Sequence, residues 1–177
     1  MNNYNKEELL REIESGKEYT FTYVDTLAID SIGFRSPIKF ELNGIRYHSV
    51  EHYMAVTKAR LLEDYDTMNK LVRATDSTKI QRYITLVKSK ELKGWETSKE
   101  DSIISLFAYL LEKDSALYEK VISLNGDVIV LADWKDTYWG TGLKPESKYN
   151  SNPRYWKGEN RYGFLLTLIR NTIKSDM

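Results

Sequence analysis

Glu51 is the residue whose type and position most directly suggest chemistry. Ser49 is predicted to cap a helix, because its hydroxyl can accept a hydrogen bond from an N–H group of the first turn, and Glu51 follows two residues later. The helix dipole favours an ionised, exposed carboxylate there. Such a carboxylate can stabilise a developing cation or activate water; the alternative is that it only complements the dipole. Helical spacing predicts the buried face of this helix: Val50, Tyr53, Met54, Thr57 and Leu61.

Lys58 lies seven residues after Glu51, which places it two turns further along the same helical face. An amine at this position can bind a phosphate group. It can also attack the carbonyl carbon of an opened ribose and form a Schiff base. The sequence leaves both roles open.

The two histidines of the chain, His48 and His52, flank Glu51 in a pattern that matches the inverted zinc-protease motif H-x-x-E-H. Zinc would need both imidazoles on one helical face and a third ligand downstream. If Ser49 is the N-cap, His48 lies outside the helix. The sequence has no other histidine and no cysteine, so we expect neither a metal site nor a cofactor.

The segment 132–158 is predicted to be a long loop, although it is rich in aromatic residues. Connections longer than about 12–15 residues are uncommon and are usually functional or disordered. Its Trp-Gly-Thr-Gly sequence contains Gly140 and Gly142, which allow a ligand to approach the backbone closely. Flat rings can stack on nucleobases; the alternative is that they fill the core. The aromatic residues are Trp134, Tyr138, Trp139, Tyr149, Tyr155 and Trp156.

A locally basic stretch occupies residues 70–93. Only Asp76 and Glu91 oppose its positive charges. The stretch is either a solvated helix surface or a wall that faces phosphate groups. Its basic residues are Lys70, Arg73, Lys79, Arg82, Lys88, Lys90 and Lys93.

The elements that must position these residues are mainly helical. Asn43-Gly44, between two alternating runs, predicts a two-residue hairpin turn with positive φ at both positions. Strands are expected at 19–24, 38–42, 45–47 and 128–131. Helices are expected at 5–15, from 50, at 66–74, from a cap at Ser77 or Thr78, from a cap at Thr97 or Ser98, from 115 to Asn125-Gly126, and at 160–174.

Length and composition set the broad class. The 177 residues suit one domain spanning 1–177, and 41% hydrophobic with 29% charged residues is typical of a globular protein. Twenty-six basic and 26 acidic residues argue against a broad nonspecific nucleic-acid surface. The sequence has no apolar run of 18 residues and no secretory signal at its start, so we expect a cytoplasmic protein without a membrane partner.

Three motifs in order along the chain resemble the NADAR family of YbiA-like N-glycosidases. They are YHSVEHY…KA at 47–59, DTYWGTG at 136–142 and WKGENRYGFLLTLIR at 156–170. The resemblance covers about residues 38–172. It implies an α+β fold, mainly helical with a small β-hairpin or sheet. It also implies hydrolysis of a ribosyl C1′–N bond, either removing ADP-ribose from guanine in nucleic acid or acting on a phosphoribosyl amine intermediate of riboflavin synthesis.

The resemblance also assigns residues. Glu51 matches the active-site glutamate of the family and Lys58 the lysine that follows it. The remaining matches are Trp95 ahead of the long central helix, Asp136, Trp139 and Gly140 of Asp-x-x-Trp-Gly, and Asn160 and Gly163 of the last motif.

Two departures from the family pattern lie near the expected pocket. Residues 32–35 read Ile-Gly-Phe-Arg where the family often has a Ser-Asn-Phe segment, and Ala55 stands where a glutamine is common. These departures bear on the substrate.

The expected reaction needs an anion near the ribose and a hydrogen-bond donor near the leaving base, which parallels glycoside hydrolysis by two carboxyl groups. Glu51 would be the anion, and Asp136 the acid or an orienting group. Trp95, Trp139, Gly140, Trp156 and Asn160 would contact a nucleotide or an ADP-ribosylated nucleic acid. The alternative is a module that binds ADP-ribose or NAD without cleaving it.

Overall fold

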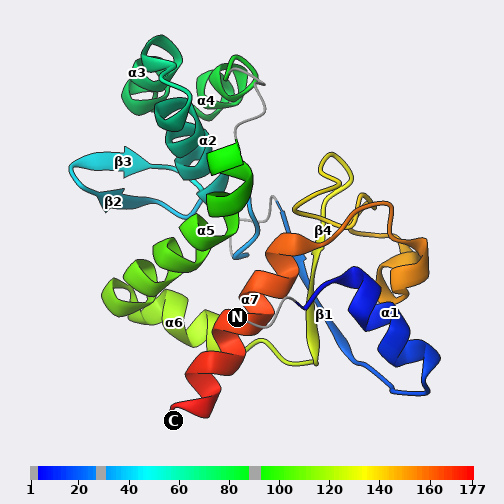
Figure 1. Ribbon diagram of the computed structural model, residues 1–177. Helices are drawn as coiled ribbons and strands as arrows, with labels where there is room; N and C mark the ends of the chain where they lie inside the picture. The colour runs from blue at the N-terminus through cyan, green and yellow to red at the C-terminus, as the bar shows by residue number, and fades with distance from the viewer. Residues whose placement is uncertain (1–3, 27–30, 88–92) are drawn as a thin grey trace. The chain divides into compact units, whose positions relative to one another are not determined.

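The structure is a computed structural model that describes residues 4–26, 31–87 and 93–177 (Figure 1). Within these residues the fold is mainly helical and contains two two-stranded sheets, which confirms the expected α+β class. The chain divides into two compact units, residues 1–34 with 111–177 and residues 35–110. The expectation of a single domain stays a prediction. In the described parts of the chain, no helix is long and apolar enough to cross a membrane.

The unit of residues 1–34 and 111–177 is built on a parallel pair of strands. β1 (Phe21–Asp25) pairs with β4 (Val128–Ala132), and Phe21 lies opposite Val128. β4 is buried along its whole length, as its continuous apolar run predicted. Figure 1 shows α7 beside β4. The other elements of this unit are α1 (Lys6–Glu14), α6 (Ser115–Ile122), α7 (Arg161–Ser175) and the 3-10 turns η1 (Lys148–Ser151) and η2 (Pro153–Tyr155).

Gly163 lets α7 approach β4 closely. A Cβ atom at this position would lie 2.2 Å from the carbonyl oxygen of Ile129 and 2.5 Å from Oδ1 of Asn160, so any side chain would displace backbone. The third motif therefore contains a glycine that the fold itself requires.

The unit of residues 35–110 begins with the predicted hairpin. β2 (Phe40–Leu42) pairs antiparallel with β3 (Ile45–Tyr47), and φ is 52° at Asn43 and 74° at Gly44, as predicted. Tyr47, Ala55, Val56 and Leu71 form its apolar core. The helices that follow are α2 (Val50–Leu61), α3 (Tyr65–Arg73), α4 (Ser77–Ile84) and α5 (Lys93–Lys113), which crosses the boundary between the units at residue 110.

Two predicted helix caps are wrong. Asp76 caps α4 by accepting a hydrogen bond from Lys79 N at 2.9 Å, so Ser77 and Thr78 lie inside the helix. Thr97 and Ser98 lie inside α5, where their hydroxyls donate to the carbonyl oxygen of Gly94. Serine and threonine satisfy a cap or an earlier helical carbonyl equally well, so their type alone does not locate a helix start.

The predicted buried face of α2 is also partly wrong. Leu61 is 47% exposed, whereas His52, Val56 and Ala59 are fully buried. β3, α3 and α4 all pack against α2, so it is buried on more than one side and a single apolar stripe does not describe it.

Candidate functional site

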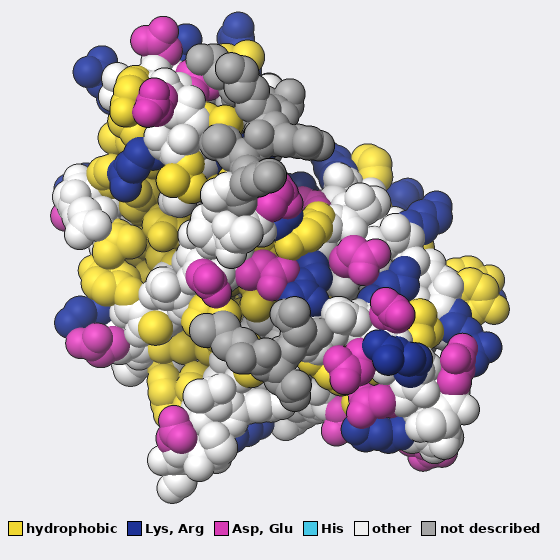
Figure 2. All heavy atoms as spheres, in the orientation of Figure 1, with side chains coloured by type: hydrophobic (Ala, Val, Ile, Leu, Met, Phe, Trp, Pro, Cys, Tyr) yellow, Lys and Arg dark blue, Asp and Glu magenta, His cyan; other side chains and the backbone are white. Residues whose placement is uncertain are grey.

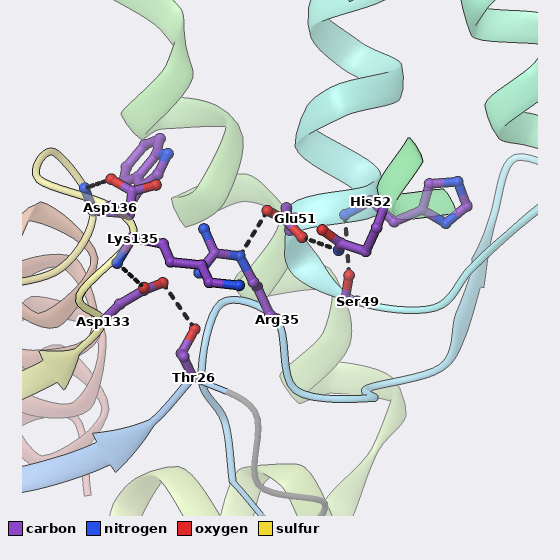
Figure 3. Close-up of polar contacts among 10 residues, drawn as sticks. Thr26, Arg35, Ser49, Glu51, His52, Asp133, Lys135 and Asp136 are labelled. Atoms are coloured by element: carbon purple, nitrogen blue, oxygen red, sulfur yellow. Dashed lines mark hydrogen bonds and ion pairs between the residues drawn. The ribbon is translucent and has the colours of Figure 1, made fainter. Parts of the chain in front are cut away.

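Ser49 begins α2 as predicted and thereby positions Glu51. Its hydroxyl oxygen accepts a hydrogen bond from the backbone N–H of His52 at 3.1 Å (Figure 3). Glu51 is the second residue of the helix and lies in its first turn. The dipole and the unpaired N–H groups of this turn favour a negative charge on its side chain.

The carboxylate of Glu51 is held at both oxygens. Arg35 Nε donates to Oε1 at 2.8 Å, and Gln81 Nε2 donates to Oε2 at 2.5 Å. Only 11% of the Glu51 side chain is exposed, so the expectation of an exposed carboxylate is wrong. A buried charge is costly unless it is paired and hydrogen-bonded, and here it has a cation and an amide as partners.

Sequence reasoning missed both partners of Glu51. Arg35 lies in the loop before the hairpin, 16 residues away, and Gln81 lies on α4, 30 residues away. No local pattern links such positions. The only signal was that Arg35 belongs to the segment that departs from the family pattern.

Lys58 and Trp95 lie close together in the same unit as Glu51. Lys58 Nζ is 6.0 Å from the centre of the Trp95 ring, at the outer limit of a cation–π contact. Trp95 is buried and Lys58 is half-buried. Residues 35–110 thus contain three of the predicted site residues, and the structure places two of them, Lys58 and Trp95, near each other.

Asp136 and Trp139 belong to the other unit. One carboxylate oxygen of Asp136 accepts hydrogen bonds from the backbone N–H groups of Tyr138 at 2.9 Å and Trp139 at 2.8 Å. Asp136 therefore fixes the turn that presents Trp139. The indole of Trp139 stacks on Phe34, with ring centres 5.3 Å apart and planes 28° apart. Phe34 covers one face of this ring, Tyr138 packs against it with ring centres 4.8 Å apart, and Trp139 as a whole is buried, so stacking on a base stays a prediction.

Gly140 packs the loop against the end of β4. A Cβ atom there would lie 2.7 Å from Cβ of Asp133. Asp133 is itself buried, and its carboxylate accepts hydrogen bonds from Thr26 Oγ1 and Lys135 N (Figure 3). Close packing already requires glycine at this position, and the approach of a ligand to Gly140 stays a prediction.

Trp156 and Asn160 are built into the core of the same unit. Trp156 packs among Leu9, Val130 and Phe164, and its indole N–H donates to Asn150 O at 2.8 Å. The side chain of Asn160 has no exposed surface; it accepts from Leu131 N at 2.8 Å and donates to Ile129 O at 3.0 Å. For these two residues the environment favours a role in the fold over contact with a ligand.

His52 makes the contacts of a neutral imidazole. Its Nε2 lies 3.1 Å from the carbonyl oxygen of Leu71, and its Nδ1 accepts from the backbone N–H of His48 at 3.3 Å. Burial lowers its pKa from 6.5 to about 4. Both ring nitrogens are engaged within the protein. Among the described residues no group of three or more potential metal-ligand side chains gathers.

The basic stretch is exposed where the structure describes it. Lys70 and Arg73 on α3 and Lys79 and Arg82 on α4 all have exposed side chains, which favours a solvated surface. Lys88 and Lys90 lie outside the described residues, as does the side chain of Lys93. A phosphate-facing role for the stretch stays a prediction.

Comparisons with known proteins support the resemblance. The model of the NADAR domain family matches residues 14–174, a longer span than the sequence motifs suggested. The protein irg-1 of Caenorhabditis elegans is 23% identical over 132 residues, which are 73% of this chain but only 62% of that relative's length. The E. coli protein YbiA, solved by NMR, has a similar fold, with a TM-score of 0.63, 21% identity and coverage of 88% of this chain and 86% of YbiA.

Proposed function

The chain belongs to the NADAR family, and on that premise we propose that it is an N-glycosidase that hydrolyses a ribosyl C1′–N bond. The proposed substrate is ADP-ribose attached to a base, guanosine in nucleic acid, or a related ADP-ribosyl or NAD-derived compound. The observation that carries the proposal is the carboxylate of Glu51, buried in the first turn of α2 and oriented by Arg35 and Gln81.

Cleavage of the C1′–N bond leaves positive charge on the ribose ring and negative charge on the base. An ionised Glu51 would stabilise the positive ring, and its fixed orientation would cost no reorganisation during the reaction. The oxygen of water bonds to C1′, the electron pair of the broken bond goes to the base nitrogen, and the proton released by the water goes to the same nitrogen. Glu51 can accept that proton first and then return it.

Lys58 and Trp95 would hold the ligand beside this carboxylate. A base stacked on Trp95 would lie next to the ammonium group of Lys58, which can bind a phosphate. In the other role, the neutral amine forms a C=N bond with the C1′ aldehyde of the opened ribose and one water molecule leaves. Both roles place the ligand at the same pair of side chains.

Asp136 acts as an orienting group in this proposal. Its Oδ1 already accepts two backbone N–H groups, and those bonds fix the turn before Trp139. Asn160 and Trp156 support the loop from within the core, so we assign them positioning roles. Trp139 is buried, and the face of its ring away from Phe34 remains the candidate for stacking on a base.

A second candidate function is a module that binds ADP-ribose or NAD without cleaving it. One observation favours it: Arg35 pairs with Glu51 and neutralises the anion that catalysis needs. The departure at Ala55 carries less weight than its sequence position suggested. Ala55 packs in the apolar core with Tyr47, Val56 and Leu71, so this change from glutamine alters the core.

A substrate panel read by mass spectrometry tests the proposal. The panel holds ADP-ribosylated guanosine in DNA, NAD, free ADP-ribose and the phosphoribosylamino intermediates of riboflavin synthesis. We expect the native chain to remove ADP-ribose from the modified guanosine and leave unmodified DNA. We expect Glu51→Gln not to do so. If only the riboflavin intermediates are cleaved, the substrate of the chain is a phosphoribosylamino compound and not ADP-ribose on a base. Tight binding of ADP-ribose without any cleavage would support the binding module.

A further inference from the structure

The loop that follows β4 contains a hollow that the proposed reaction does not use. Its volume is about 510 Å³, within the range of small-molecule sites. Trp134, Thr137, Lys144 and Lys157 contribute to its lining, together with Gly142, Leu143, Glu146 and Ser147. All of these residues belong to the unit of residues 1–34 and 111–177.

Trp134 is unlike the other three tryptophans of the chain. Its side chain is 54% exposed, whereas Trp95, Trp139 and Trp156 are buried. Lys135 Nζ lies 5.1 Å from the centre of its ring and brings a positive charge beside it. An exposed indole beside a cation is accessible to a ligand, and such rings stack on nucleobases of any kind.

The charges around the hollow favour an anion. Lys144 and Lys157 line it and are exposed, and Glu146 is the one acidic residue among the lining residues. Over α1 and the loop after β4, Figure 2 shows basic and acidic side chains interspersed. The charges of the lining residues therefore suit one or two phosphates.

Hydrogen bonds hold the walls of the hollow in place. The buried amide of Asn150 donates to Lys144 O at 2.8 Å and accepts from Thr141 Oγ1 at 3.0 Å. Gly158 N donates to Thr141 O at 2.8 Å. Gly142 has φ 69°, and a Cβ atom there would lie 2.9 Å from Cβ of Lys157. A wall formed before binding loses little entropy when a ligand arrives.

We infer that this hollow is an accessory nucleotide site, in which a base stacks on Trp134 and its phosphate lies between Lys144 and Lys157. The ligand chemistry is a planar base that carries a phosphate, supplied either by a free nucleotide or by a single-stranded nucleic acid. The inference goes beyond the proposed function and does not depend on Glu51.

Calorimetric titration with adenosine, AMP, inorganic phosphate and a six-nucleotide oligo(dA) tests the site. AMP and the oligonucleotide should bind, and adenosine should bind more weakly because it lacks the phosphate. Trp134→Ala should weaken binding by roughly 5- to 150-fold, the range expected for one stacked base, and Trp134→Phe should retain most of it. Binding of the oligonucleotide without AMP identifies a strand as the ligand, and binding of AMP alone identifies a free nucleotide.

Charge variants complete the test. Lys144→Gln combined with Lys157→Gln should weaken AMP binding and leave the affinity for adenosine unchanged. Lys148→Gln is the matched control, because Lys148 is exposed on the same loop but does not line the hollow. AMP binding that is unchanged by both Trp134→Ala and the double variant would overturn the inference and leave the proposed function standing. Phosphate binding as tight as AMP binding would overturn the stacking role of Trp134.

Discussion

The first turn of α2 and the loop after β4 use their polar side chains in opposite ways. Glu51 is bound by two other side chains, Arg35 and Gln81. Asp136 and Asn160 instead bind backbone groups of their own unit. A buried charged pair is weak evidence for stability, because desolvation offsets its attraction, whereas side-chain bonds to backbone satisfy groups that any fold must satisfy. We therefore propose that Glu51 has a chemical role and that Asp136 and Asn160 have structural ones.

Glu51→Gln tests the chemical role proposed for Glu51 and should have the largest effect on turnover. Turnover on any substrate that the native chain cleaves should fall by at least about 100-fold, because the amide cannot carry the negative charge. Stability should also fall, by roughly 1–3 kcal/mol, since the guanidinium of Arg35 loses its counter-charge. Turnover assays and urea melts measure the two effects.

Glu41→Gln is the matched control for that change. Glu41 pairs with Arg46 in the same unit at 3.4 Å, but both side chains are largely exposed. Removing this charge should change stability by less than about 0.5 kcal/mol and leave turnover unaltered. Native turnover in Glu51→Gln would contradict the assignment of Glu51.

Trp156→Ala and Trp139→Ala together test whether these two tryptophans of the loop after β4 support the fold or contact a ligand. Trp156→Ala should lower stability by about 3–5 kcal/mol, because it empties a core site and leaves Asn150 O without its indole donor. Trp139→Ala should lower stability and, if its second face stacks on a base, should also weaken ligand binding by about 1–3 kcal/mol. Thermal melts and ligand titration on both variants decide between the roles. An unchanged melting temperature in Trp156→Ala would contradict the core assignment.

His52 links the stability of residues 35–110 to pH. The unfolded chain takes up a proton near pH 6.5, whereas burial delays protonation of the folded form to about pH 4. The stabilisation from the neutral ring is therefore complete above pH 6.5 and is lost as the pH falls toward 4. The loss should reach about 3 kcal/mol, at about 1.4 kcal/mol per pKa unit.

Urea melts between pH 7 and 4 measure this loss. His52→Gln should show less of it, although the variant starts from lower stability. His48→Gln, at the half-buried neighbouring histidine, should keep most of the native pH dependence, because burial lowers the pKa of His52 more than the charge of His48 does. Equal acid sensitivity in the native chain and His52→Gln would contradict the account.

The sequence predicted what depends on local spacing and missed what depends on contacts between distant residues. Asn43-Gly44, the Ser49 cap and the apolar run of β4 were predictable, because each is determined by its neighbours. The partners of Glu51 were not, since tertiary packing alone brings Arg35 and Gln81 to it. The roles of Asn160 and Trp156 were also hidden, because a motif does not reveal whether a polar group faces a ligand or a strand.

Gln81→Ala should have the smallest effect and tests how finely Glu51 is positioned. The amide of Gln81 contributes one hydrogen bond from an exposed residue, so its loss should cost about 0.5–1.5 kcal/mol, or a roughly 2- to 13-fold fall in kcat. KM should change little, because the charge of Glu51 remains.

Gln81→Glu should reduce kcat further, since it places a second negative charge beside the first. Arg82→Ala, the exposed neighbour on α4, is the control and should behave as the native chain. If kcat and KM of Gln81→Ala match those of the control, Gln81 contributes only to packing, and Arg35 alone orients the carboxylate.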